Sequence, residues 1–295
     1  MAETHHFDIN RLFGVKGFVC VVTGGGTGIG LMTTQALAAN GAKVYITGRR
    51  MEALENAAKS HSPNHGGQII PVGPCDVRKK SDLEKLVKDI SAREKYINLL
   101  VCNAGVSGAK AEPDDHDARK LKKTLWENET VEDWQATFET DVTSVYFTTI
   151  AFLPLLQAGI EPDGPLEKFS PSVITISSMS GLMSHAQGHF SYNAAKGATV
   201  HLTKLMSAEF QQTGIRVNSI APGYFPSEMT AKSSDENQKS HLPAEKIEEK
   251  GHVPAMRGGR DEEMGMTVLY FAKNNYVNGE IIAVDGGVLN VVGGR

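Results

Sequence analysis

Residues 18 to 30 read Phe18-Val19-Cys20-Val21-Val22-Thr23-Gly24-Gly25-Gly26-Thr27-Gly28-Ile29-Gly30, and this stretch decides the fold. Its first half is almost continuously apolar, which predicts a β-strand buried on both faces of a parallel sheet. Its second half is rich in glycine, and the residues Ile29–Asn40 that follow have a helical pattern. A strand that enters a helix through a glycine turn presents free N–H groups and a positive helix end to an anion.

This arrangement is typical of a site for the pyrophosphate of a dinucleotide. A glycine cluster alone is weak evidence, because glycine also marks ordinary turns. Here the cluster follows a predicted strand and opens a predicted helix, which is the context that the motif requires. We therefore expect the following residues to bind the cofactor at this end: Thr23, Gly24, Gly26, Thr27, Gly28, Ile29 and Gly30.

Strand-like and helical patterns alternate along the rest of the chain. This alternation predicts an α/β fold, a single-domain Rossmann-type doubly wound parallel sheet with helices on both faces. The predicted strands are Phe18–Thr23, Ala42–Thr47, Gln68–Val72, Ile97–Cys102, Ser172–Ser177, Ile215–Ile220 and Gly279–Val284. The predicted helices are Ile29–Asn40, Ser81–Ala92, Val131–Leu156, Ser191–Thr213 and Arg260–Phe271.

Composition agrees with one domain spanning 1–295. A chain of 295 residues with 40% hydrophobic residues can build a single large core. The net charge of −4 argues against a nucleic-acid partner, and no apolar run reaches the roughly 20 residues that span a bilayer. The three cysteines form no CxxC pair and are expected to be free, buried thiols. The residues before Asn10 do not resemble a secretory signal, so the cytoplasm is the expected location.

Two long segments interrupt the alternation. Ser107 to Glu129 is charged and is expected to be a solvated surface insertion. Tyr224 to Arg260 is expected to form a loop or lid on the substrate side, because a loop of this length in a compact domain often covers a binding site.

The end of the second predicted strand indicates which dinucleotide binds. Sites for NAD usually carry Asp or Glu there, on the ribose 2′-hydroxyl. This chain has Arg49 and Arg50 and no carboxylate. A guanidinium can hold a 2′-phosphate with two hydrogen bonds, whereas a carboxylate would repel it. The sequence therefore predicts NADP(H), with Arg49 as the main contact; Arg50 is either a second contact or a solvated residue of the following helix.

A tyrosine and a lysine four residues apart, Tyr192 and Lys196, lie on one face of a predicted helix. An ammonium group stabilises a nearby phenolate, which makes such a pair usable for acid–base chemistry. Ser178 follows another predicted strand, at the end where doubly wound sheets bind ligands. Its hydroxyl could donate a hydrogen bond to a carbonyl oxygen as negative charge develops there, although consecutive serines can also form a plain turn.

Seven motifs follow one another along the chain: Thr23-Gly24-x-x-x-Gly28-x-Gly30, Cys75-Asp76-Val77, Cys102-Asn103-Ala104-Gly105, Ser178, Tyr192-x-x-x-Lys196, Pro222-Gly223 and Val284-Asp285-Gly286-Gly287. In this order and combination, the chain from about Phe18 to Gly287 resembles the short-chain dehydrogenases/reductases, in particular members similar to 3-oxoacyl-carrier-protein reductases and found in fungal genomes. The resemblance implies that Tyr192 exchanges a proton with the substrate oxygen, that Ser178 polarises that oxygen, and that Lys196 holds the nicotinamide ribose. It also implies a dimer or tetramer through the helices at Val131–Leu156 and Ser191–Thr213. The further cofactor contacts that it implies are Asp76 and Val77 at the adenine, Asn103, Ala104 and Gly105 at the adenosine ribose, and Pro222, Gly223 and Ser227 at the nicotinamide amide.

One position departs from the family pattern. Where the family has an asparagine that positions a water molecule behind the lysine, this chain has Asp141. Asp141 shares a helical row with Trp134, Phe138 and Val145, which should face the core. A buried carboxylate is costly unless it is paired. We expect Asp141 either to hold the relay water and add negative charge near Lys196, or to impair the relay.

The expected activity is transfer of a hydride from NADPH to a ketone or 3-oxoacyl-like carbonyl of a small molecule, with the reverse alcohol oxidation. The B-face delivery of hydride and the reductive direction follow from the resemblance. Two alternatives remain, a non-catalytic NADP(H)-binding protein and a redox-neutral isomerase or cyclase on the same fold. No metal site is expected, because His185 and His189 lie in a loop beside Gly188 without an evident third ligand.

Overall fold

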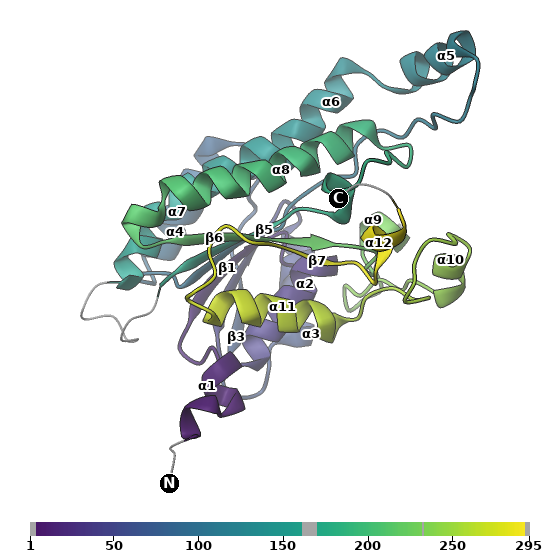
Figure 1. The fold of residues 1–295 in the computed structure, drawn as a ribbon. Coiled ribbons are helices and arrows are strands. Elements are labelled where there is room, and N and C mark those ends of the chain that lie inside the picture. Colours follow the sequence, from purple (N-terminus) through teal and green to yellow (C-terminus); the bar gives the residue numbers. More distant parts are fainter. Residues whose placement is uncertain (1–3, 161–169, 232, 293–295) are drawn as a thin grey trace.

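The computed structural model describes residues 4–160, 170–231 and 233–292. Within these residues the chain forms one sheet of seven parallel strands in the order β3-β2-β1-β4-β5-β6-β7 (Figure 1). This confirms the predicted Rossmann-type sheet, and the strands differ from the predicted ranges by no more than one or two residues at either end. The strands are β1 (Val19–Thr23), β2 (Lys43–Thr47), β3 (Gln68–Pro71), β4 (Leu99–Cys102), β5 (Ser172–Ile176), β6 (Arg216–Pro222) and β7 (Ile281–Val284).

Helices cover both faces of the sheet, as predicted (Figure 1). Helices α2 (Gly28–Ala39), α3 (Met51–His61) and α11 (Asp261–Lys273) pack on one face. Helices α4 (Lys80–Ser91), α7 (Ser144–Gln157) and α8 (Phe190–Glu209) pack on the other. The alternate residues of each strand therefore enter two separate cores, which explains why the strands are apolar throughout.

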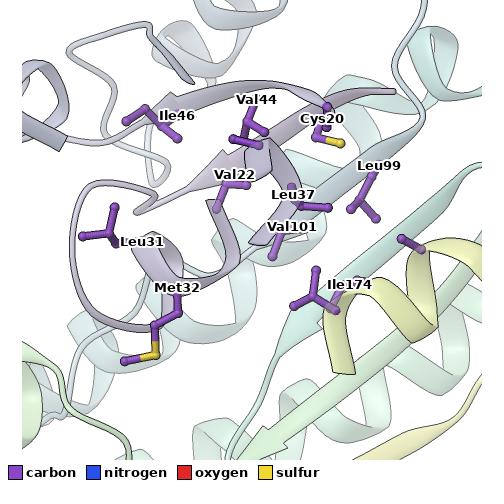
Figure 2. Packing of buried hydrophobic residues seen from close by; sticks show 14 of the residues in the cluster. Cys20, Val22, Leu31, Met32, Leu37, Val44, Ile46, Leu99, Val101 and Ile174 are labelled. Carbon is purple, nitrogen blue, oxygen red and sulfur yellow. The ribbon is translucent and has the colours of Figure 1, made fainter. Parts of the chain in front are cut away.

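The core beneath α2 shows this packing directly. Val22 of β1, Val44 of β2 and Val101 of β4 meet Leu31 and Leu37 of α2 (Figure 2). All of these side chains are buried. Because the core fixes α2 against β1, it also fixes the glycine turn that joins them.

The sheet extends from β1 in two directions: β2 and β3 lie on one side of it, and β4 to β7 lie on the other. Chain segments leaving the carboxyl ends of β1 and β4 therefore diverge to opposite faces of the sheet. In open α/β sheets, ligands bind in the crevice at such a point.

A long helical segment crosses the second face. It consists of α6 (Val131–Phe138), one π-helical turn (Glu139–Thr143) and α7. By length and composition alone, Val131–Ile160 could span a membrane. However, α7 packs against β4, β5 and α4, and this packing accounts for its buried apolar residues. We therefore interpret the segment as a core helix of the domain.

Several helices were not evident in the sequence. The expected insertion contains α5 (Ala118–Asn128), which begins at Asp117 because that carboxylate accepts the N–H groups of Arg119 and Lys120. The expected lid contains α9 (Glu228–Ala231) and α10 (Ala244–Glu248); Lys232 lies outside the described residues. Helix α3 was also missed, although it buries Leu54 and Ala57. The remaining short helices are α1 (Ile9–Phe13) and α12 (Val288–Val291), with 3-10 turns at His5–Phe7, Ala158–Ile160, Met179–Gly181 and Gln211–Thr213.

Candidate active site

A cleft of about 300 Å³ opens at the carboxyl ends of the strands. It brings together almost all of the residues predicted to bind a cofactor or to act in catalysis. Those lining it are Gly24, Gly26, Thr27, Gly28, Ile29, Arg49, Arg50, Asp76, Val77, Asn103, Ala104, Gly105, Ser178, Tyr192, Lys196, Pro222, Gly223 and Ser227. Thr23, Gly30 and Asp141 lie behind its wall instead.

The glycine turn forms one end of the cleft. Gly24 and Gly28 have positive φ angles of 64° and 52°, which only glycine adopts readily. A Cβ on Gly30 would lie 2.1 Å from the carbonyl oxygen of Gly24. Gly30 therefore allows α2 to approach the turn, while Gly24 and Gly28 shape the surface of the cleft. This cradle, at the N-terminus of α2, has the backbone that a pyrophosphate requires.

A hydrogen-bond network joins the turn to the end of β4. Thr23 Oγ1 accepts the N–H groups of Asn103 and Ala104, at 3.0 and 3.1 Å. The amide of Asn103 donates to the carbonyl oxygens of Thr23 and Gly24, at 3.0 and 3.1 Å. Thr23 thus acts from behind the cleft, by holding together the two loops that form its floor.

The other end of the cleft contains Ser178, Tyr192 and Lys196. Ser178 follows β5 and is 7% exposed, and its hydroxyl oxygen accepts the N–H of Ser180 at 3.1 Å. Lys196 Nζ lies 5.6 Å from the centre of the Tyr192 ring and donates to the carbonyl oxygen of Ile176 at 3.0 Å. The hydrogen bond from Lys196 therefore goes to the last residue of β5, the strand that Ser178 follows. This contact holds Lys196 and its helix neighbour Tyr192 in place beside Ser178.

Asp141 lies directly behind this group, in the π-helical turn. Its carboxylate is fully buried, and Oδ1 lies 3.8 Å from Lys196 Nζ and accepts the N–H of Val106 at 3.0 Å. Oδ2 has no hydrogen-bond partner among the described residues. Burial raises the pKa of Asp141 above its ordinary value, against the attraction of Lys196. The predicted row is therefore confirmed at Asp141, which is buried beside the lysine.

Gly105 makes the close approach of Asp141 and Lys196 possible. A Cβ at this position would lie 2.7 Å from Asp141 Oδ1 and 3.4 Å from Lys196 Nζ. Any larger residue would push one of these two charged groups away. Only the backbone of Gly105, without a side chain, therefore lies between the cleft and the buried carboxylate at this point.

Charged residues surround the far end of the cleft, beyond the glycine turn. Asp76 accepts the guanidinium of Arg78 at 2.6 Å, and this contact lowers the pKa of Asp76 to about 2. Arg50 donates two hydrogen bonds to Glu228, at 3.1 and 2.7 Å. Arg49 is exposed and, among the described residues, forms no hydrogen bond or ion pair.

The sequence did not point to Arg78 or Glu228. Arg78 stands two residues after Asp76, where an alternating charge on a helix-flanking loop gives no distinct signal. Glu228 is 178 residues from Arg50 in the chain, and only the fold brings them together. A third contact that was missed joins Tyr224 to His252 (3.0 Å) and to Gln187 (3.2 Å) beside the catalytic end.

The comparisons with known proteins agree with this geometry. The family model for short chain dehydrogenases matches residues 18–238. The chain belongs to the short-chain dehydrogenase/reductase family. It is 39% identical over 287 residues to the short-chain dehydrogenase/reductase PhomF of Diaporthe leptostromiformis, covering 95% of this chain and 94% of the relative.

Two bacterial members of the family are also similar. The rhamnolipids biosynthesis 3-oxoacyl-[acyl-carrier-protein] reductase of Pseudomonas aeruginosa is 30% identical over 277 residues, covering 93% of this chain and 97% of the relative. A solved structure described as a Pseudomonas aeruginosa RhlG/NADP active-site complex superposes with a TM-score of 0.77 at 28% identity, over 94% of this chain and 98% of that one. As a short-chain dehydrogenase/reductase, this chain is an oxidoreductase with a nicotinamide cofactor.

Proposed function

We propose that this short-chain dehydrogenase/reductase reduces a carbonyl group of a small molecule with NADPH. The observation that carries the proposal is the meeting of Ser178, Tyr192 and Lys196 at one end of a cleft whose other end holds Arg49. A dinucleotide that bridged these two ends would place its ring near the tyrosine and its adenosine near the arginine. The presence of all three side chains argues against a binding protein without catalysis.

The chain's own residues supply the acid–base chemistry. The cofactor, when bound, provides the hydride. Tyr192 gives its phenolic proton to the substrate oxygen, and the ammonium of Lys196 stabilises the phenolate that remains. Ser178 donates its hydroxyl hydrogen to the same oxygen, where negative charge develops. In alcohol oxidation, the same groups carry the proton in the opposite direction.

The test of the activity is NADPH oxidation measured across ketones, quinones and 3-oxoacyl thioesters. A reductase consumes NADPH in proportion to the alcohol formed. Product that forms without NADPH consumption would instead favour an isomerase or cyclase. Tight NADPH binding with no turnover on any compound would favour a binding protein.

The choice of NADP(H) over NAD(H) rests on Arg49. Its side chain lines the cleft and is exposed, and among the described residues no carboxylate forms an ion pair with it; the carboxylate of Asp76, which attracts it, is paired with Arg78. Its guanidinium is therefore available to a 2′-phosphate. Replacing Arg49 with Asp should weaken NADPH binding at least tenfold and leave NADH binding almost unchanged, whereas an unchanged preference refutes the assignment. Arg11→Asp, an exposed arginine of α1, is the control for charge reversal alone.

Within the segment 224–260, the substrate side is proposed to include the part around Tyr224 and His252, whereas residues 227–230 line the cofactor end of the cleft. Tyr224 immediately follows Gly223 of the cleft, and its hydroxyl bonds to His252 of the same segment and to Gln187 of the loop before Tyr192. Burial raises the pKa of Tyr224, which keeps its hydroxyl neutral. This polar cluster suits a carbonyl compound that carries further hydrogen-bonding groups.

The proposed oligomer uses the outer faces of the long helices. Leu205 of α8 is 50% exposed, and Tyr146 of α7 is 39% exposed. Exposed apolar residues on outer helices are typical of a surface that a second copy covers. The cysteines Cys20, Cys75 and Cys102 are free and buried, in keeping with the proposed cytoplasmic location.

A further inference from the structure

A segment of the substrate-side loop crosses the cofactor end of the cleft. We call residues 227–239 the strap; Lys232 within it lies outside the described residues. The strap starts against the glycine turn, since a Cβ on Gly28 would lie 2.9 Å from the Cβ of Ser227. Thr230 holds this start in place, because its hydroxyl donates to the carbonyl oxygen of Phe225 and accepts the N–H of Ser227.

Glu228, the first residue of α9, pairs with Arg50, which follows β2 by three residues. Its carboxylate receives both terminal nitrogens of the Arg50 guanidinium, at 3.1 and 2.7 Å. Ser234 of the strap donates to the same carboxylate at 3.4 Å. Arg50 and Glu228 both line the cleft, next to Arg49. The carboxylate of Glu228 is therefore bound to the Arg50 guanidinium, at the place proposed for the 2′-phosphate.

We infer that Glu228 competes with the 2′-phosphate of NADP(H) for Arg50 and so lowers the affinity for the phosphorylated cofactor. This inference rests on the proposed function, in which Arg49 and Arg50 bind that phosphate. A phosphate dianion and a carboxylate both accept hydrogen bonds from the same N–H groups of a guanidinium, and they repel each other when both are close to it. Glu228 thus acts through Arg50, as a residue that sets cofactor specificity without contacting the reacting atoms.

The size of the effect follows from exposure. The Arg50 side chain is 61% exposed and that of Glu228 is 33% exposed, so solvent screens the ion pair. Measured ion pairs of this kind contribute little, which corresponds to a change in binding constant of about two- to fivefold. A pair this weak tempers phosphate binding without preventing it, and it leaves the affinity for NAD(H), which has a hydroxyl there, almost unchanged.

The strap is also attached at its far end, independently of Arg50. Lys239 forms an ion pair with Asp261 of α11 and donates to Gln35 of α2 at 2.5 Å. His61 of α3 hydrogen-bonds to the carbonyl oxygen of Asn237 at 2.7 Å. Removing the charge of Glu228 should therefore leave the strap in place. Lys239→Gln provides a matched control, because it loosens the strap without touching the arginines.

The experiment measures the dissociation constants of NADP⁺ and NAD⁺ by isothermal titration calorimetry. Glu228→Gln should bind NADP⁺ about two- to fivefold more tightly than the native protein and bind NAD⁺ equally well. In an Arg50→Gln background the same substitution should change neither constant. Lys239→Gln should not reproduce the selective gain.

Weaker or unchanged binding of NADP⁺ by Glu228→Gln would overturn the inference, as would an equal change for both cofactors or the same gain in Lys239→Gln. A native protein that prefers NADP⁺ but does not respond to Glu228→Gln overturns this inference alone. A native protein that binds NAD⁺ at least as well as NADP⁺ overturns the proposed cofactor, and the competition with it.

Discussion

Replacing Asp141 with Asn tests how the buried carboxylate acts on the catalytic lysine. The substitution keeps the shape of the side chain and removes its charge. Asp141 Oδ1 lies 3.8 Å from Lys196 Nζ. With an effective dielectric constant of about 20, two unit charges at this distance attract each other by about 4 kcal/mol. The carboxylate is fully buried, so bulk water screens this attraction only slightly.

The expected result is the loss of the acid limb of the pH–rate profile. Burial raises the pKa of Asp141, so the native carboxylate is ionised only above that raised value and takes up a proton as pH falls through it. Lys196 then loses its counter-ion, which produces the acid limb of the native profile. The amide of the Asp141→Asn variant is uncharged at every pH, so the variant should react at the low rate of the protonated native protein and show no acid limb from this position.

The assay is kcat/KM for NADPH-dependent reduction between pH 5 and 10, with the first ketone found to turn over. Glu139→Gln is the matched control, because it removes an exposed carboxylate from the same π-helical turn. Its profile should coincide with that of the native protein. Coincident profiles for Asp141→Asn and the native protein, or an acid limb that persists in the variant at the native pH, would refute a role of the Asp141 charge.

Three further predictions concern the frame of the site and its surroundings. Arg78→Gln should lower the free energy of unfolding by about 1 kcal/mol at pH 7. Arg78 holds the pKa of Asp76 at about 2, well below its ordinary value of 3.8. The difference in free energy between variant and native protein should therefore vanish as pH falls from 4 to 2, as urea titrations can measure. Gly105→Ala should reduce kcat at least tenfold with little change in melting temperature, because its Cβ would press on Asp141; normal turnover would contradict this packing. Leu205→Glu should convert the proposed oligomer to monomers in light scattering, and an unchanged mass would exclude this face as the interface.

The sheet could be predicted from the sequence because its signals are local. Each strand is a short apolar run with a turn at its end, and the two-sided burial of a parallel sheet makes such runs conspicuous. The residues of the cleft were predictable for the same reason. Gly24, Ser178 and Pro222 each follow the end or lie at the end of a strand, and the topology of the sheet brings those ends together.

What could not be predicted depends on contacts between distant segments. The pairing of Arg50 with Glu228 requires the strap to cross the cleft, and nothing near either residue indicates it. Helix α5 was not predicted because its many charges resemble those of a solvated loop, and none of its residues is buried. The spacing of Tyr192 and Lys196 was a correct sign of a helix, but it gave no sign that Lys196 and Thr199 are buried while Leu205 is exposed.

The central claim is that the Tyr192 hydroxyl, held beside the Lys196 ammonium, is the proton donor for a carbonyl reduced at the nicotinamide end of the cleft. The most direct measurement is single-turnover NADPH oxidation by Tyr192→Phe, together with its dissociation constant for NADPH. The account predicts a rate lower by about a thousandfold, with an NADPH dissociation constant within about twofold of the native value. A Tyr192→Phe variant that oxidises NADPH at more than about a tenth of the native rate would contradict the account.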